Sequence, residues 1–137
     1  MGVDNVKRLV VIIGLTFLLS GCFGKTVCKS PNGENDVDIS YTIKYYDDNV
    51  RKVVLDKTYN FSTKEELENY SAIMNYTIKK DTTDNIIIDS KKKNNKYILT
   101  YRYNVNKMNE EELKQSGLKR NKTELINYLN SNGFTCK

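Results

Sequence analysis

The chain contains no histidine and no tryptophan among its 137 residues, and it has one proline and one alanine. Histidine is the commonest general base and the commonest metal ligand in proteins, so its absence removes the usual nucleophilic triads and most zinc sites. A glycine-rich phosphate-binding loop is also missing. We therefore expect no catalytic residue, no metal site and no cofactor, and an enzyme built on serine, lysine or carboxylates is the alternative.

Concentrated positive charge is missing as well. The 22 Lys and Arg residues exceed the 17 Asp and Glu residues by five, and they are spread along the chain. The clearest basic run, Lys91-Lys92-Lys93, adjoins two asparagines and is typical of a solvated turn. Nucleic-acid-binding proteins concentrate their basic residues on one face or in a known motif. We expect no nucleic-acid partner.

One apolar stretch runs from Leu9 to Leu19, directly after Lys7 and Arg8. It is too short for a transmembrane helix, which needs about 20 residues. A positive start, a short apolar centre and small residues at its exit are typical of a secretory signal peptide. A buried strand or helix of the core is the alternative, but no polar pattern or turn residue frames the stretch. We predict a signal peptide over residues 1–21.

The end of this stretch, Leu19-Ser20-Gly21-Cys22, resembles the bacterial lipobox. The resemblance implies cleavage between Gly21 and Cys22 and a diacylglyceryl group on the Cys22 sulfur, with acyl chains such as palmitate. A cysteine is required because the thiolate is the nucleophile that forms the thioether. Two acyl chains hold a protein stably at a bilayer, whereas one holds it only marginally. We predict a lipid-anchored protein on the extracytoplasmic face of a bacterial cell membrane.

Two cysteines remain once Cys22 is assigned to lipid. Cys28 and Cys136 lie near opposite ends of the mature chain. A disulfide can persist outside the cytoplasm, and one that closes a loop of about 109 residues would contribute ~4–5 kcal/mol in the chain-entropy model. Two unrelated free thiols are the alternative. A redox-active pair and a metal site fit less well, because neither a C-x-x-C spacing nor a histidine is present.

The folded part shows two rounds of strand, strand and helix. Apolar and polar residues alternate over 37–45, and a turn at 47–49 leads to a second strand over 53–61 that Lys57 interrupts. A capping box at Ser62–Glu65 predicts a helix to about Lys79. The second round has strands from Ile86 and over 97–105, helices capped by Asn109 and Asn121, and a short last strand over 134–137.

This order, ββα–ββαα, predicts an α+β fold. Hairpins require antiparallel pairing, and helices that follow each hairpin can cover one face of the sheet. We predict an antiparallel sheet of four to five strands with two to three helices packed on one face. The expected organisation is a signal peptide at 1–21, a lipidated tether at 22–36 and a single domain at 37–137.

The chain resembles the YehR-like small bacterial lipoproteins. The resemblance rests on the lipobox, the unit from Ser62 to Lys79, Glu111-Glu112-Leu113 and the terminal Gly133-Phe134. It covers nearly the whole mature chain and implies an envelope protein of unknown function, with no catalytic or binding residue to carry over. The pair Cys28 and Cys136 is not a feature of that resemblance.

Ten tyrosines are the most suggestive feature of the composition. Five of them fall on predicted inward faces, where aromatic bulk fills a small core: Tyr41, Tyr45, Tyr97, Tyr101 and Tyr103. The alternative is a groove that stacks on a sugar or a peptide, and Tyr46, on the outward face, is the candidate ligand-binding residue for that idea.

We expect a non-enzymatic module that binds a protein or a cell-wall ligand of the envelope. An accessory role through protein contact is the first alternative, and a hydrolase-type enzyme is the second.

Overall fold

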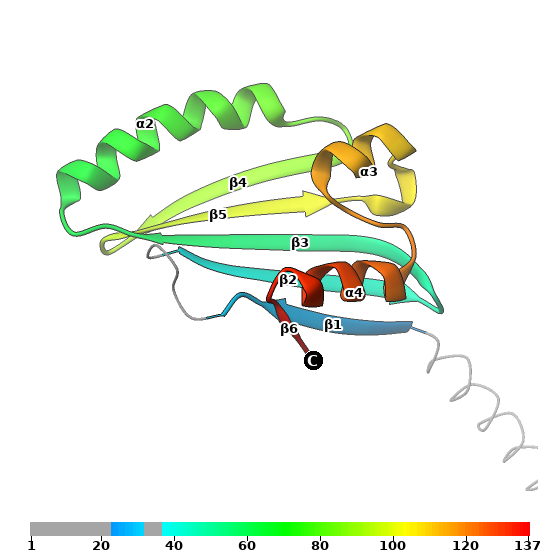
Figure 1. The fold of residues 1–137 in the computed structure, drawn as a ribbon. Helices are drawn as coiled ribbons and strands as arrows, with labels where there is room; N and C mark the ends of the chain where they lie inside the picture. The colour runs from blue at the N-terminus through cyan, green and yellow to red at the C-terminus, as the bar shows by residue number, and fades with distance from the viewer. Residues whose placement is uncertain (1–22, 32–36) are drawn as a thin grey trace, which may run out of the picture.

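The computed structural model describes residues 23–31 and 37–137. In this part of the chain one six-stranded antiparallel sheet carries three α-helices (Figure 1), and the strand order is β4-β5-β3-β2-β1-β6. The α+β class is confirmed, with more strands than predicted. The elements are β1 (Phe23–Lys29), β2 (Val37–Tyr46), β3 (Asn49–Asn60), α2 (Lys64–Asp81), β4 (Ile86–Lys93), β5 (Lys96–Tyr103), the 3₁₀ turn η2 (Val105–Lys107), α3 (Glu110–Ser116), α4 (Lys122–Ser131) and β6 (Thr135–Cys136).

The two faces of the sheet differ in the way that the alternation along β2 predicts. Tyr41 pairs with Leu55 of β3, and Leu55 with Tyr101 of β5, so these side chains share one face. All three helices pack on that face, which we call the helix-covered face. The opposite, uncovered face carries mainly charged and hydroxyl side chains.

Strand β1 corrects one prediction. Phe23–Lys29, assigned to the tether, pairs with β2 along its whole length. Its residues on the helix-covered face are Gly24, Thr26 and Cys28, which are too small to produce the apolar alternation that marks a strand in sequence. Residues 1–22, with the predicted signal peptide and Cys22, lie outside the described residues, as do residues 32–36.

Capping residues set the helix boundaries. Asn109 and Asn121 each accept a hydrogen bond from the backbone N–H three residues on, at 2.9 and 3.0 Å, as predicted. Helix α2 begins one residue later than expected, because its cap is Thr63, which accepts from the N–H of Glu66 at 3.2 Å. Gly117 ends α3 in the left-handed conformation, with φ of 66°, which glycine adopts without strain.

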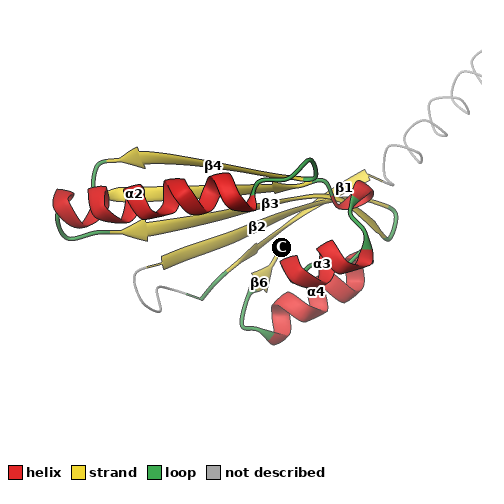
Figure 2. Cartoon of the chain, turned by 90° about the horizontal axis from the view of Figure 1, so that it is seen from above, coloured by secondary structure: helices red, strands yellow, loops and turns green. Residues whose placement is uncertain are grey.

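The core has two parts. The larger cluster lies under α3 and α4 and includes Ile43, Val53, Val105, Leu113 and Leu125. The smaller cluster lies under α2 and holds four buried residues, Leu67, Ile88, Tyr97 and Leu99. Figure 2 shows the reason, since α2 and the α3–α4 pair cover different parts of the sheet. No helix within residues 23–31 and 37–137 is both long and apolar enough to cross a bilayer.

Candidate functional site

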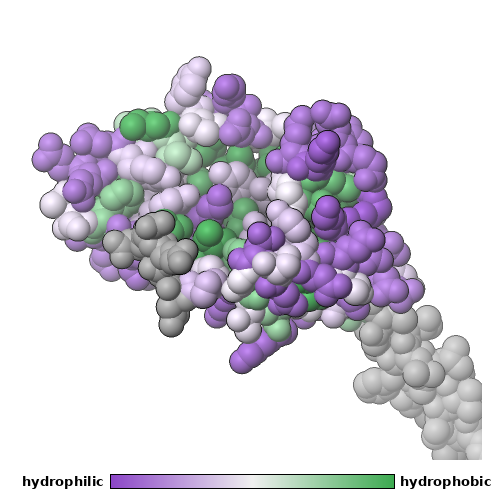
Figure 3. All heavy atoms as spheres, viewed as in Figure 1, coloured by the Kyte–Doolittle hydropathy of each residue, from purple (hydrophilic) through white to green (hydrophobic). Residues whose placement is uncertain are grey.

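A cleft lies on the helix-covered face where α2 and α3 separate. Its volume is about 450 Å³. Apolar atoms gather between the two helices in the space-filling view (Figure 3). The sheet provides Ile86, Ile88, Tyr101 and Tyr103, α2 provides Lys80 and Asp81, and α3 provides Glu112 and Gln115. We call this the tyrosine cleft.

Aromatic rings form the cleft and its surroundings. Tyr101 and Tyr103 point the same way from β5, and their rings are nearly parallel, 6.0 Å apart between centroids and 6° between planes. Lys57 of β3 extends over the Tyr101 ring, with its Nζ 5.5 Å from the centroid. This contact explains why a lysine can interrupt the apolar pattern of the second predicted strand. Strand β3 continues through Lys57, whose side chain faces the helices and places its charge over an aromatic ring.

The tyrosines continue beneath α2. The ring of Tyr70 lies 5.1 Å from that of Tyr59 and 5.3 Å from that of Tyr97. Tyr97 is fully buried, and its hydroxyl makes no hydrogen bond with any residue that the structure describes. On the other side of the sheet's centre, Tyr41 packs edge-on against Phe134 at 5.3 Å. The five inward tyrosines predicted from the alternation are therefore on the face that was expected.

Burial raises the pKa values of four tyrosine phenols on this face, those of Tyr41, Tyr70, Tyr101 and Tyr103. Desolvation is the first cause of the raised pKa of Tyr103, followed by the charges of Tyr101 and Tyr41. Desolvation also raises the pKa of Tyr101, with further contributions from Tyr59, Asp81 and Tyr97. The pKa values of Tyr41 and Tyr70 are raised by burial in the same way. These four phenols therefore stay protonated, as hydrogen-bond donors, well into the alkaline range.

We expect the stability of the fold to fall as the pH rises above 10.0, the ordinary pKa of a tyrosine phenol. Above that pH the unfolded chain releases phenol protons that the native chain retains, so proton release favours unfolding. Below pH 10.0 both the native and the unfolded chain keep their phenol protons, so these tyrosines cause no loss of stability there. Tyr103→Phe should move the midpoint of alkaline unfolding to higher pH, as followed by circular dichroism and phenolate absorbance.

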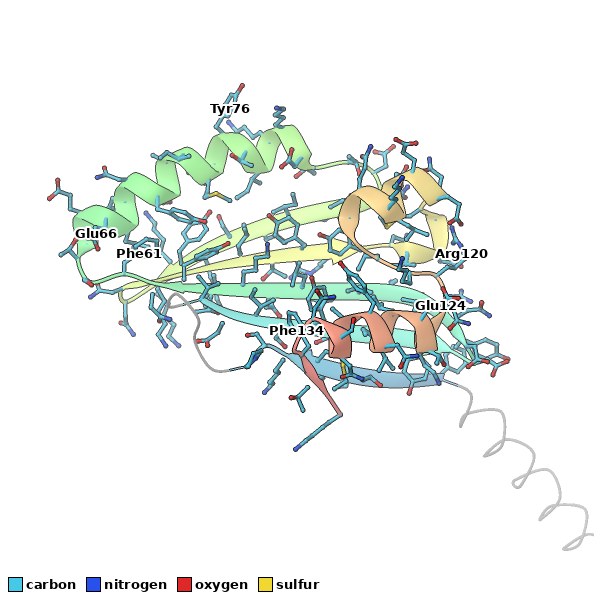
Figure 4. The ribbon with its side chains drawn as sticks, in the orientation of Figure 1. Phe61, Glu66, Tyr76, Arg120, Glu124 and Phe134 are labelled. Atoms are coloured by element: carbon cyan, nitrogen blue, oxygen red, sulfur yellow. A yellow bond between two sulfur atoms is a disulfide. The ribbon has the colours of Figure 1, made fainter. Side chains whose placement is uncertain are left out.

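The matched control is Tyr76→Phe, since Tyr76 of α2 is 75% exposed and points away from the sheet (Figure 4). This control should leave the alkaline midpoint in place. An equal shift for both variants would show that burial at β5 is not the source of the effect.

Cys28 and Cys136 form a disulfide, and they are paired neighbours on β1 and β6. Cys28 is fully buried within the larger cluster. Tyr46 lies on the uncovered face, half-buried, with its ring 4.5 Å from that of Phe23. Tyr46 and the tyrosine cleft therefore lie on opposite faces of the sheet.

Among the described residues, no group of three or more Cys, Asp or Glu side chains is arranged to hold a metal ion. The tyrosine cleft is lined by two phenols, two isoleucines, one amide, the hydroxyl residues Thr83 and Ser116, and charged side chains of both signs. Such a lining can stack on flat apolar surfaces and exchange hydrogen bonds with hydroxyl or amide groups. The sequence offered one signal for it, the repeated tyrosines of β5.

No family model matches the chain, and no curated protein matches its sequence significantly. Two solved NMR structures are similar in fold. One is a protein from Streptococcus pneumoniae TIGR4, with a TM-score of 0.61 and 13% identity over 84% of this chain and 85% of that chain. The other is the YehR protein of E. coli, with a TM-score of 0.64 and 12% identity over 83% and 91%. The likeness concerns the fold, and at that level it supports the YehR-like resemblance.

Proposed function

We propose that the chain is a lipid-anchored, extracytoplasmic envelope protein that binds a protein or cell-wall ligand through the tyrosine cleft and performs no catalysis. The observation that carries the proposal is the lipobox, Leu19-Ser20-Gly21-Cys22, which ends one residue before strand β1. The anchor and the folded part would therefore be joined directly. The cleft supplies the second element, because it is the aromatic hollow between α2 and α3.

The disulfide supports the same compartment. Cytoplasmic thiols are kept reduced, whereas disulfides persist in exported proteins. Pairing Cys28 with Cys136 accounts for two of the three cysteines in the sequence and leaves Cys22 outside this disulfide. A single remaining cysteine at the end of an apolar leader fits lipidation better than it fits a redox role.

The test compares the natural chain with Cys22→Ala in a bacterium fed with labelled palmitate. The natural chain should take up label and sediment with membranes, and the variant should lose both properties, because the acyl chains are attached only through the Cys22 sulfur. The Cys28→Ala/Cys136→Ala variant is the control for general effects of cysteine replacement and should keep the label. Unchanged labelling in Cys22→Ala would overturn the anchor.

The same strains can test the cleft. A photo-reactive amino acid at Gln115, which is exposed at the rim, should form adducts with an envelope component in the anchored protein. The matched position is Tyr76, on the outer side of α2. Equal adduct patterns at both positions would contradict binding at the cleft.

A further inference from the structure

Three lysines form a row across the uncovered face. Lys25 of β1 pairs with Lys44 of β2, and Lys44 pairs with Lys52 of β3. Neighbouring strands lie about 4.8 Å apart, so these side chains leave the sheet side by side. Like charges directly opposite each other destabilise a sheet. Strand β3 adds the exposed Arg51 beside them, at the point where the pairing register of β2 and β3 shifts.

These four cations have no close ion-pair partner in the described part of the chain, and one carboxylate, that of Asp84, lines a hollow together with Lys44 and Lys52. None of them forms an ion pair within 4.0 Å of a carboxylate there. The acidic residues of the adjoining β2–β3 turn are Asp47 and Asp48. The Asp48 carboxylate lies 3.9 Å from the Lys122 Nζ of α4, and this ion pair offsets the negative charge of Asp48. Asp47 is thus the one acidic residue of this turn left to offset four positive charges.

Aromatic side chains border the same end. Phe23 is 66% exposed, although its ring contacts that of Tyr46. On the other side of β1, Gly24 lies so close to the ring of Tyr45 that a Cβ would clash with it. The strands are therefore held tightly together here. A shallow hollow of about 510 Å³ lies among Phe23, Gly24, Tyr45, the three lysines and Arg51. We call Phe23, Lys25, Lys44, Tyr46, Arg51 and Lys52 the basic end.

The start of β1 places the basic end beside the predicted anchor. β1 begins at the end of the sheet that carries the β2–β3 turn (Figure 1). Three residues of chain span at most about 11 Å, so Lys25 cannot lie farther than that from Cys22. This distance is comparable to the Debye length of about 8 Å at physiological ionic strength, within which a charged surface attracts basic residues.

We propose that the basic end docks on the anionic headgroups of the membrane to which Cys22 is tethered. The inference rests on the proposed function, since it needs the anchor. The lysine row and Arg51 would meet headgroup phosphates, which remove the repulsion within the row. Phe23 and Tyr46 would lie at headgroup level, where amphipathic aromatic rings are favoured. The direct connection of Cys22 to β1 would then fix the orientation of the domain, so that it does not swing on a tether.

The absence of tryptophan gives a clean probe of this docking. In Tyr46→Trp the new indole is the single one in the chain, and it lies on β2, away from the lipidated residue in sequence. The lipidated protein is reconstituted in vesicles of phosphatidylcholine alone and of an equimolar mixture with phosphatidylglycerol. We expect emission at shorter wavelength, and quenching by brominated acyl chains, on the mixed vesicles only. Salt at 1 M should abolish the difference, because the Debye length falls to about 3 Å.

A matched pair of triple variants separates this end from general positive charge. Lys25→Gln/Lys44→Gln/Lys52→Gln should lose the spectral shift, with an unchanged or raised midpoint of thermal unfolding, because a repulsive row is relieved. The control replaces Lys91, Lys93 and Lys96, which are exposed on the same face around the β4–β5 turn, at the other end of the sheet. This control should keep the shift.

The outcomes distinguish the two proposals. A chain whose mass shows no lipid would overturn the proposed function and the docking together. A lipidated chain with the same emission on neutral and mixed vesicles would overturn the docking and leave the anchor in place. Loss of the shift in both triple variants would also overturn it, since the effect would then belong to net charge.

Discussion

Replacing Cys28 and Cys136 by alanine is expected to lower the free energy of unfolding by about 4–5 kcal/mol. The two cysteines are separated by 108 positions, and closing a loop of this length in the unfolded chain removes conformational entropy of that order. Such a loss is a large share of the 5–15 kcal/mol that is typical of a whole domain. For a domain of this size it corresponds to a fall in Tm of about 15 °C or more.

The surroundings of the disulfide make compensation in the native state difficult. Strand β6 is two residues long and pairs with β1 only at Cys28–Cys136 and Lys29–Thr135 among the described residues, and two further backbone hydrogen bonds of 2.9 Å join Val27 and Lys137. Cys28 is fully buried beneath α4. Without the covalent link, β6 is expected to leave β1, which would expose the backbone edge of β1 at Cys28 and Lys29.

Thermal and urea unfolding of the oxidised protein, the reduced protein and the double alanine variant measure this effect. Alanine is preferable to serine, because an unpaired hydroxyl at position 28 would add a desolvation cost of its own. The reduced protein and the double variant should agree to within about 1 kcal/mol. A loss below that size in both would show that the two ends of the chain stay together without the bond.

Much of the fold could be predicted because local and global preferences agree. Tyr41 and Ile43 alternate with Thr42 and Lys44 along β2, and the sheet places the two sets on opposite faces. Asparagine caps mark α3 and α4 for a reason that is local to the chain, namely a side-chain oxygen that accepts a backbone N–H.

The elements that were missed depend on distant partners. β1 has small inward residues because Tyr45 covers Gly24 and the disulfide occupies Cys28, and neither partner is visible from positions 23–29 alone. In the sequence, Lys57 looks like an interruption of the strand. Its place is explained only by Tyr101, a residue of another hairpin whose ring lies beneath the Lys57 charge. The disulfide itself was one of several possibilities, and the sheet order that brings β6 beside β1 is what selects it.

The tyrosine cleft could not be predicted from sequence, because it depends on how far α2 lies from α3. The alternation identifies Tyr101 and Tyr103 as inward, and an inward tyrosine is usually a core residue. Whether it lines a hollow depends on the length and tilt of helices that arrive from other parts of the chain. The basic end was missed for a related reason: Lys25, Lys44 and Lys52 are far apart in sequence, and the strand register alone joins them.

Because the core is divided into two clusters, we expect alanine substitutions of a leucine in each cluster to lower the free energy of unfolding by different amounts. Leu125 of α4 is fully buried in the larger cluster, and Leu67 of α2 is 2% exposed in the smaller one. Leu→Ala substitutions cost 2–5 kcal/mol, depending on how far the site can relax. We expect a loss of about 4 kcal/mol for Leu125→Ala and about 2 kcal/mol for Leu67→Ala.

The reason is the different attachment of the two helices. The start of α4 is held by backbone hydrogen bonds from Val50 to Arg120, at 2.9 Å, and from Lys122 to Asp48, at 2.8 Å, so a cavity at Leu125 cannot close by a shift of the helix. Of the 18 residues of α2, Leu67 and Ser71 are buried, and the helix can move down onto a smaller side chain.

Amide hydrogen exchange distinguishes a local loss from a global one. In Leu67→Ala the amides of α2 should exchange rapidly while those of β2 and β3 keep their protection, because helix release is a sub-global opening. In Leu125→Ala protection should fall across the sheet and the helices together, by the same free energy as in urea unfolding. Equal losses of protection in α2 and β3 for both variants would mean that the two clusters unfold as one unit. The gap between α2 and α3 would then be a rigid cleft and not a place where the domain can open.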